Sequence, residues 1–504
     1  MDHANEAGGG AVLDLLVVGG GINGAGIARD AAGRGLKVLL VEMGDLASAT
    51  SGWSSKLIHG GLRYLEHYEF RLVREALAER EVLLAIAPHL VRPMNFVLPH
   101  DTSMRPVWMV RIGLWMYDHL GKRVSLPGSK AVAFPHVEFS AGLRGDLRAG
   151  FVYADCRVDD ARLTVANVVS ARAKGAQVAT RTRFVSARRE AGAWIAELED
   201  TREGARRTVR ARAIVNAAGP WVGKVLEGIP ARPSGAQVRL VKGSHIVVPK
   251  VHSQGHAYLL QNTDKRVVFV IPFEGRFSLI GTTDVPVATV EEAKDIKPEE
   301  ITYLLQAANR YLARPLDRED VVWTFAGIRP LYDDGRSDPS AITRDYVMEL
   351  DEEGGAAPAL SIYGGKLTTY RCLAETALGK LARHFPAMGR PWTAGEALPG
   401  GDMANFNAFR DEVSDRYKGF SREMLEGVVR RHGTRALDIL GKARKPEDLG
   451  MHFGAGLTAR EVEHLIGEEW AQTAEDILWR RTKCGLHMDS MQLSSLEAYL
   501  GARR

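Results

Sequence analysis

The chain has 504 residues, enough for two or three domains, and its 45% hydrophobic and 25% charged residues are typical of a soluble globular protein. Its 66 basic and 62 acidic residues leave a net charge of +4, which is too balanced to argue for binding to nucleic acid. The three cysteines lie far apart and form no Cys-x-x-Cys pair, so we expect neither a disulfide framework nor a metal site. No window of about eighteen apolar residues is free of charge, so we expect no transmembrane helix, a result that leaves surface attachment open.

Residues 12–42 read in the order strand, glycine-rich turn, helix, strand. The turn satisfies the G-x-G-x-x-G pattern, in which Gly19 allows the tight turn and Gly21 lets the backbone approach a pyrophosphate. Gly24 lets the helix pack closely on the strand. The N-terminus of the helix then offers free N–H groups and a partial positive charge to phosphates. The segment therefore predicts a dinucleotide site.

Glu42 ends the second strand of this pattern, 21 residues after Gly21. A carboxylate at about this distance accepts hydrogen bonds from the ribose hydroxyls of an adenosine. A carboxylate in place of an arginine also disfavours a 2′-phosphate. FAD or NAD therefore fits the site better than NADP.

The segment 105–123 is aromatic and basic at once. Its apolar residues at helical spacing are Trp108, Met109, Ile112, Trp115 and Met116, and its basic residues include Arg105, Arg111, Lys122 and Arg123. Helices that lie in a membrane interface combine aromatic and basic residues in this way. An ordinary core helix with charged ends is the alternative, and Gly113 and Asp118 weaken the membrane interpretation.

The later segments predict further parts of the nucleotide-binding domain, followed by antiparallel strands and then by helices. A helix is expected over about 160–174 and strands over 178–185 and 213–216, and the motif NAAGPW at 216–221 follows. Residues 238–290 alternate apolar and polar residues, as antiparallel strands do. After a linker rich in proline and glycine, residues 405–500 read as helices. We therefore predict an α/β fold with a Rossmann-like binding domain built from discontinuous segments, an inserted antiparallel-sheet substrate domain and a C-terminal helical domain.

Six short motifs in one order point to a family. The glycine-rich turn is followed by SSKLIHGGLRYLE at 54–66 and VNAAGPW at 215–221, and then by GIRPL at 327–331, ITRDY at 342–346 and GGKLTTYR at 364–371. Together they resemble the FAD-dependent glycerol-3-phosphate dehydrogenases of the bacterial aerobic type, over about residues 12–400 and more weakly beyond. Two departures from the family pattern are Ala218, where threonine is more usual, and Trp53.

The resemblance implies a division of the chain into an FAD-dependent oxidoreductase region, 12–390, and a C-terminal helical domain, 391–504. Within the first region, FAD-binding segments are expected at about 12–105, 150–225 and 340–385. Substrate-covering segments are expected at about 106–149 and 226–339.

The resemblance also assigns residues to the FAD site and none to a metal. The cofactor residues it implies are Gly19, Gly20, Gly21, Ile22, Asn23, Gly24, Glu42, Ser54, Ser55, Lys56, Leu57, His59, Gly60, Asn216, Ala217, Gly219, Gly364, Gly365, Lys366, Leu367 and Thr368.

The substrate residues implied are Arg63, Tyr64, Arg329, Arg344 and Lys366, and the catalytic ones are His245, Arg329 and Lys366. Arginine suits a small phosphorylated alcohol because its fork of donors binds phosphate oxygens and stays charged. Hydride transfer from C2 of the substrate to the flavin requires a base for the C2 hydroxyl proton. We expect this base to be His245; a water held by Lys366 or Tyr64, or His59, is a rival, and a half-buried structural histidine is the alternative interpretation.

The activity implied is oxidation of sn-glycerol 3-phosphate to dihydroxyacetone phosphate, with electrons passed from FAD to a ubiquinone-type acceptor in the membrane. The resemblance further implies a homodimer that binds peripherally to the cytoplasmic side of the inner membrane and is otherwise cytoplasmic. Two enzyme classes compete: an oxidase that reduces oxygen, and another FAD-dependent amine or 2-hydroxyacid oxidoreductase. A tRNA-modifying or regulatory FAD protein is disfavoured, because no dense basic stripe offers a nucleic-acid site.

Overall fold

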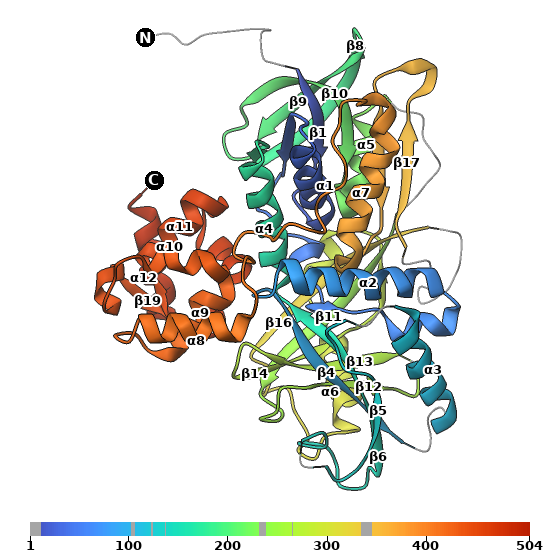
Figure 1. Ribbon diagram of the computed structural model, residues 1–504, viewed down its shortest axis with the longest axis vertical. Helices are drawn as coiled ribbons and strands as arrows, with labels where there is room; N and C mark the ends of the chain where they lie inside the picture. The colour runs from blue at the N-terminus through green and yellow to red at the C-terminus, as the bar shows by residue number, and fades with distance from the viewer. Residues whose placement is uncertain are drawn as a thin grey trace.

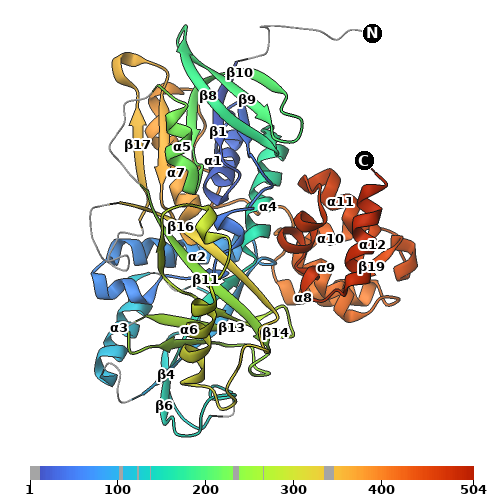
Figure 2. The same ribbon diagram turned by 180° about the vertical axis from the view of Figure 1, so that it is seen from behind.

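A computed structural model of the chain describes residues 12–101, 106–121, 124–136, 138–230, 238–264, 266–333 and 345–503. In both views of the molecule, one sheet fills the upper half, a second sheet fills the lower half, and the C-terminal helices stand to one side (Figures 1 and 2). Among the described residues, no helix is long and apolar enough to cross a membrane.

The first sheet has eight strands around a parallel centre in the order β18, β10, β1, β2, β7. β17 pairs antiparallel with β18, and β8 and β9 extend β10 as antiparallel strands. The bounds are β1 (Leu13–Val18), β2 (Val38–Val41), β7 (Gln177–Ala179), β8 (Thr182–Glu190), β9 (Ala193–Asp200), β10 (Arg206–Asn216), β17 (Val347–Asp351) and β18 (Ala359–Tyr363). The strands come from three distant parts of the chain, as predicted for a discontinuous Rossmann-like domain.

Helices α1 (Ile22–Gly33), α4 (Asp160–Ala173) and α7 (Tyr370–Leu381) cover one face of this sheet. The core between them is built from small and branched residues, since α1 is rich in alanine and glycine and can approach the strands closely. Gly26 illustrates the fit, because a Cβ there would lie 2.7 Å from the ring of Tyr370 on α7. α5 (Val222–Glu227) follows β10.

The second sheet has ten strands in the order β15, β11, β14, β13, β12, β4, β6, β3, with β16 on β11 and β5 on β6. Its bounds are β3 (Leu57–Ile58), β4 (Val91–His100), β5 (Lys130–Ala133), β6 (Ala149–Val158), β11 (Val238–Pro249), β12 (Ala257–Gln261), β13 (Val267–Phe273), β14 (Phe277–Gly281), β15 (Val285–Val287) and β16 (Trp323–Tyr332). All neighbours are antiparallel except β12 and β4. Helix α6 (Pro298–Asn309) packs on this sheet.

The membership of this sheet differs from the predicted segment boundaries. β4 and β6 fall inside the segments predicted to bind FAD, yet both lie in the second sheet, paired along their whole length. The physical reason is that the sheet a strand joins depends on its pairing partners, and a local run of residues carries no sign of them. The described strands cross between the two sheets four times, as often as the predicted segments alternate.

Helices α2 (Phe70–Ile86) and α3 (Val107–Leu120) lie beside the second sheet. α3 buries Leu114 and Tyr117, while Trp108 and Trp115 are 61% and 62% exposed. Its other exposed large apolar residues are Val107, Met109 and Ile112. An ordinary core helix is therefore only part of the description, because one side of α3 packs on the core through Leu114 and Tyr117 while a second apolar set faces solvent.

The C-terminal region is helical, as predicted. It contains α8 (Phe406–Arg416), α9 (Arg422–His432), α10 (Ala436–Leu440), α11 (Ala459–Glu469), a π-helical turn (Asp476–Arg481) and α12 (Ser490–Gly501). A small hairpin of β19 (His452–Gly454) and β20 (Leu457–Thr458) was not predicted, because strands of two or three residues leave no periodic pattern. The preceding linker is docked rather than free, since Trp392 packs against Gly33 and Arg29 of α1.

Candidate active site

A cavity of about 230 Å³ opens where β1, β2, β10 and β18 end, at the N-terminus of α1. The glycines of the turn create this space. Gly19 has φ +113°, and a Cβ there would lie 2.5 Å from the carbonyl oxygen of Ala217. A Cβ on Gly24 would lie 1.9 Å from the carbonyl oxygen of Gly19. Only glycine fits at these two positions, which is what a turn that cradles a pyrophosphate requires.

Glu42 lines the same cavity at the end of β2. Its two carboxylate oxygens accept hydrogen bonds from the backbone N–H groups of Gly20 and Gly44, both at 2.7 Å. Burial raises the pKa of the Glu42 carboxyl, and the two backbone donors oppose that shift. The carboxylate is therefore held in place by the backbone, with its remaining acceptor capacity available to the hydroxyls of a ribose.

Most of the predicted cofactor residues meet at this cavity. Those that line it are Gly19, Gly21, Ile22, Asn23, Glu42, Ser54, Ala217, Gly219, Gly364, Gly365, Lys366 and Leu367. The prediction missed the loop 47–51 and the strand start Thr182–Phe184, which also line it. The serine and threonine residues of the loop were a usable signal, since Ser51 accepts a hydrogen bond from the backbone of Ile22 at 2.9 Å.

Other predicted cofactor residues support the cavity without lining it. Asn216 donates to the carbonyl oxygen of Val222 at 2.9 Å and so holds the NAAGPW turn. Lys56 is buried, and its Nζ atom lies 2.8 Å from a carboxylate oxygen of Asp160. The same carboxylate accepts a hydrogen bond from the backbone N–H of Ser54. His59 lines a different cavity, described next.

This second cavity, of about 120 Å³, lies between residues 59–66 and the second sheet. Arg63, Tyr64 and Arg329 line it, as the substrate assignment predicted. The Nζ atom of Lys366 lies 3.7 Å from the centre of the Tyr64 ring. Because Lys366 lines the first cavity and Tyr64 the second, this contact marks where the two cavities meet.

Arg329 reaches the second cavity from β16. Its guanidinium forms an ion pair with Asp284 and donates to the hydroxyl of Thr282 at 3.2 Å. Gly243 makes room for it, since a Cβ there would lie 2.7 Å from Nη2. Arg344, the remaining predicted substrate residue, lies outside the described residues.

His245 lies in the middle of β11 and is only 2% exposed. Its Nε2 atom is 2.9 Å from the hydroxyl of Ser55, and its ring stacks on Phe325 with centroids 4.7 Å apart. Burial, with Arg329 and Lys56 nearby, holds the pKa of His245 well below its usual range. The imidazole is therefore neutral, and it lines neither of the two cavities.

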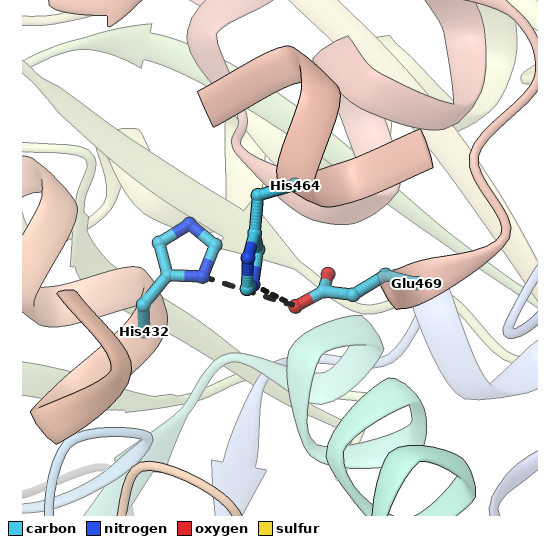
Figure 3. Close-up of side chains that lie close together, drawn as sticks. All are labelled: His432, His464 and Glu469. Atoms are coloured by element: carbon cyan, nitrogen blue, oxygen red, sulfur yellow. Dashed lines mark ion pairs between the residues drawn. The ribbon is translucent and has the colours of Figure 1, made fainter. Parts of the chain in front are cut away.

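One cluster of possible metal ligands occurs among the described residues, and it lies in the C-terminal region. His432, His464 and Glu469 place their ligand atoms within 4.8 Å of one another, and both imidazoles face the same carboxylate oxygen (Figure 3). Arg162 of α4 already donates to both oxygens of Glu469 and lies 3.3 Å from His432 Nδ1. A divalent cation would sit beside this guanidinium, so we interpret the cluster as an ion-pair network that joins α4 to α9 and α11.

Comparisons with known proteins agree with this geometry. The model of the family described as "FAD dependent oxidoreductase" matches residues 14–371, and the one described as "C-terminal domain of alpha-glycerophosphate oxidase" matches residues 392–499. A solved glycerol-3-phosphate dehydrogenase from Bacillus halodurans, in complex with FAD, superposes with a TM-score of 0.75 at 29% identity, covering 98% of this chain and 90% of that one.

Three curated relatives match almost the whole chain. D-erythritol 1-phosphate dehydrogenase from Brucella abortus is 53% identical over 94% of this chain and 95% of its own length. Glycerol-3-phosphate dehydrogenase from Pseudomonas aeruginosa is 53% identical over 97% and 95%. Aerobic glycerol-3-phosphate dehydrogenase from Escherichia coli is 51% identical over 97% of both chains.

Proposed function

Because this chain belongs to the family of FAD-dependent oxidoreductases and shares half its residues with bacterial glycerol-3-phosphate dehydrogenases, we propose that it oxidises sn-glycerol 3-phosphate to dihydroxyacetone phosphate. It is an oxidoreductase, and its cofactor is FAD. The observation that carries the proposal is the meeting of the two cavities at Lys366 and Tyr64, with arginines on the substrate side.

The substrate cavity suits a small phosphorylated alcohol. Arg63 and Arg329 supply planar forks of donors that bind phosphate oxygens in pairs, and Tyr64 adds an aromatic wall. Asp284 keeps the Arg329 guanidinium in place before the substrate arrives. We include Arg344 among the substrate residues only because it lies in the ITRDY motif at 342–346.

Bound FAD supplies the acceptor for the hydride that leaves C2 of the substrate. The protein must then remove the C2 hydroxyl proton, and His245 takes it on Nε2 through the hydroxyl of Ser55. Burial is the main cause of the depressed pKa of His245, and a substrate dianion on Arg329 would offset the smaller part that comes from the Arg329 charge. Lys366, with its ammonium between the cavities, stabilises negative charge that develops during the transfer.

The exposed face of α3 supports a peripheral membrane role. Two tryptophans and three aliphatic or sulfur side chains face solvent on one helix, an arrangement that suits the headgroup region of a bilayer. On its other side α3 is tied to the site, because Tyr117 donates to Asp155 at 2.6 Å and accepts from the backbone of Gly60 at 2.8 Å. We therefore propose peripheral attachment to a membrane. The cytoplasmic side of the inner membrane, a ubiquinone-type electron acceptor and a homodimer complete the proposal through the family resemblance alone.

A second candidate substrate is D-erythritol 1-phosphate. The relative that carries this name is as similar as the glycerol-3-phosphate dehydrogenases, and a longer polyol phosphate uses the same arginines. The two substrates share the phosphate and the secondary hydroxyl. They differ in the length of chain that the substrate cavity must hold.

The test is the visible absorption spectrum of the purified protein, followed anaerobically after each substrate is added. We expect glycerol 3-phosphate to bleach the flavin band, and glycerol without phosphate to leave it unchanged. Faster bleaching by D-erythritol 1-phosphate would move the assignment to the longer substrate. Bleaching by amines or 2-hydroxyacids alone would contradict both.

The acceptor is tested on the reduced protein. We expect a soluble quinone analogue to reoxidise the flavin much faster than dissolved oxygen does. Rapid reoxidation by oxygen with release of peroxide would instead identify an oxidase.

A further inference from the structure

A third cavity, of about 80 Å³, lies where the second sheet meets the C-terminal helices. We call it the basic cavity. Its charged lining residues are the cations Lys56, Arg92, Arg157, Arg430, Arg431 and Lys483 and the carboxylates Asp159 and Glu274, and His89 lines it as well. It shares no lining residue with the substrate cavity.

Four of the six cations already have a carboxylate partner. The pairs are Lys56 with Asp160 at 2.8 Å, Arg430 with Glu274 at 2.9 Å, Arg431 with Glu461 at 2.6 Å and Lys483 with Asp159 at 3.1 Å. These pairs balance their own charges. The excess positive charge of the cavity therefore comes from the other two cations.

Arg92 on β4 and Arg157 on β6 are those two cations, and they lie directly opposite each other in the antiparallel pair. Like charges directly opposite on neighbouring strands destabilise a sheet. Within the described part of the chain, neither guanidinium has a hydrogen bond or an ion pair, and Arg92 only stacks on the ring of Phe406 at 4.8 Å. Burial, then Arg157 and Arg430, lower the pKa of Arg92 to about 8, an effect that Glu274 and Glu426 offset only in part.

Such a pair is costly unless an anion lies between its members. A cavity of this size holds several water molecules, at roughly 10–15 Å³ of cavity volume each, and so admits a small oxyanion. Two guanidinium forks and a nearby ammonium group match the tetrahedral oxygens of phosphate better than they match a single carboxylate.

We propose that the basic cavity binds a phosphate-class dianion, either inorganic phosphate or the phosphate end of a small phosphomonoester, separately from the substrate site. The anion would contact Arg92 and Arg157 of the sheet together with Arg430 and Lys483 of the C-terminal region. It would therefore hold the C-terminal helices against the body of the protein and raise the stability of the whole chain.

The experiment is equilibrium dialysis of the FAD-loaded protein against radioactive inorganic phosphate at constant ionic strength. Three variants are compared: Arg157→Met in the basic cavity, Arg329→Met in the substrate cavity, and Arg207→Met on the exposed part of β10 as a charge-matched control. We expect the Arg329→Met and Arg207→Met variants to keep the basic-cavity site. In the Arg157→Met variant its affinity for phosphate should fall by at least about tenfold.

The melting temperature gives an independent readout. Phosphate should raise it in the parent and in Arg329→Met but not in Arg157→Met, which without phosphate should be at least as stable as the parent because one repulsive charge is gone. Should Arg157→Met fail to fold, as judged by its flavin spectrum, Arg92→Met makes the same test. Equal phosphate binding and an equal rise in melting temperature in Arg157→Met and the parent would overturn the proposal, as would loss of all binding in Arg329→Met.

Glycerol 2-phosphate distinguishes the two possible anions, inorganic phosphate and a phosphomonoester. It is added to the Arg329→Met variant together with radioactive phosphate. Competition with radioactive phosphate would show that the basic cavity accepts a phosphomonoester. Absence of competition would restrict it to inorganic phosphate.

Discussion

At the scale of single residues, the site depends on side chains that the protein holds before any ligand arrives. Arg329 is paired with Asp284 and given room by Gly243, and His245 is held between Ser55 and Phe325. Preorganised donors and bases of this kind cost little reorganisation when the substrate binds. Substitutions at these positions should therefore separate substrate binding from chemistry.

Arg329→Met should raise the KM for glycerol 3-phosphate by roughly 10- to 100-fold, since a hydrogen bond to a charged group contributes about 1.5–3 kcal/mol. Bound FAD should stay at the parental level, because Arg329 lines only the substrate cavity. Steady-state kinetics and the flavin spectrum check both expectations. Arg276→Met, an exposed arginine at the turn before β14, is the control, and an unchanged KM in Arg329→Met would remove this residue from the phosphate site.

His245→Gln should slow flavin reduction at saturating substrate by about 100-fold or more, with a much smaller effect on KM. Stopped-flow absorption of the flavin band measures the reduction rate. Gly281→Ala is the companion variant, because its new Cβ would lie 2.1 Å from His245 Cδ2 and displace the ring. A reduction rate equal to that of the parent in both variants would show that His245 is not the base.

At the scale of elements, the C-terminal region holds part of the cofactor site. Arg481, from the π-helical turn, is completely buried and donates to both oxygens of Asp45 at 2.8 Å, and Arg480 also contacts this carboxylate. Asp45 begins the loop whose next residues, 47–51, line the FAD cavity. An element more than four hundred residues away in sequence thus fixes this wall of the site.

Arg481→Met should loosen FAD, because Asp45 would keep Arg480 as a partner but lose two of the hydrogen bonds that fix its loop, each worth about 1.5–3 kcal/mol. The released flavin is measured by its fluorescence as the protein is diluted. Arg503→Met breaks an ion pair of about half-exposed side chains instead, and it should change stability by less than about 1 kcal/mol. Equal FAD retention in the two variants would show that the contact with Asp45 is not needed.

The α3 face makes a second prediction at this scale. Replacing Trp108 and Trp115 together by serine should weaken binding to anionic liposomes by at least about tenfold, because each indole buries a large apolar area in the interface. Co-sedimentation measures the bound fraction. Met491→Ser removes an even more exposed apolar side chain from α12 and should leave binding unchanged; a similar loss in both variants, or none in either, would contradict the proposal.

At the scale of the whole molecule, buried neutral histidines should set its sensitivity to acid. Burial lowers the pKa of His256 to about 3 and that of His432 to about 4; for His432 the nearby Arg162 adds to the shift, and Glu461 and Glu469 oppose it. The unfolded chain binds protons at these groups near pH 6.5 and the folded chain does not. Stability is therefore complete above this pH and falls as the pH drops from about 6.5 towards 4, by up to roughly 1.4 kcal/mol per pH unit for each histidine.

His256→Phe should flatten this loss. His256 stacks on His252 at 4.4 Å and packs among Phe139 and Tyr258, so a phenyl ring suits the same space without binding a proton. Urea unfolding at pH 7 and pH 5 measures the difference. We expect the variant to lose less stability than the parent between the two values, and identical losses would contradict the assignment.

Much of the fold could be predicted from interactions between residues that are close together in the chain. The turn at Gly19–Gly24, its flanking strands and the acid at Glu42 depend on contacts within thirty residues, and the structure confirms each of them. Helix α4 was predicted almost to its ends. The sheet that β4 and β6 join could not be predicted in this way, because it is decided by pairing partners that lie far away in sequence.

The sequence by itself determined the fold class and the cofactor, since the glycine-rich turn, its flanking strands and the later motifs are typical of an FAD-dependent oxidoreductase. Tertiary structure alone decided which residues meet. It placed His59 on the substrate side, Lys56 in the wall of the basic cavity, and Arg92 opposite Arg157 across two strands. The physical reason is that burial and charge pairing depend on distances between segments that no local pattern encodes, whereas backbone turns and helix caps depend on neighbours in the chain.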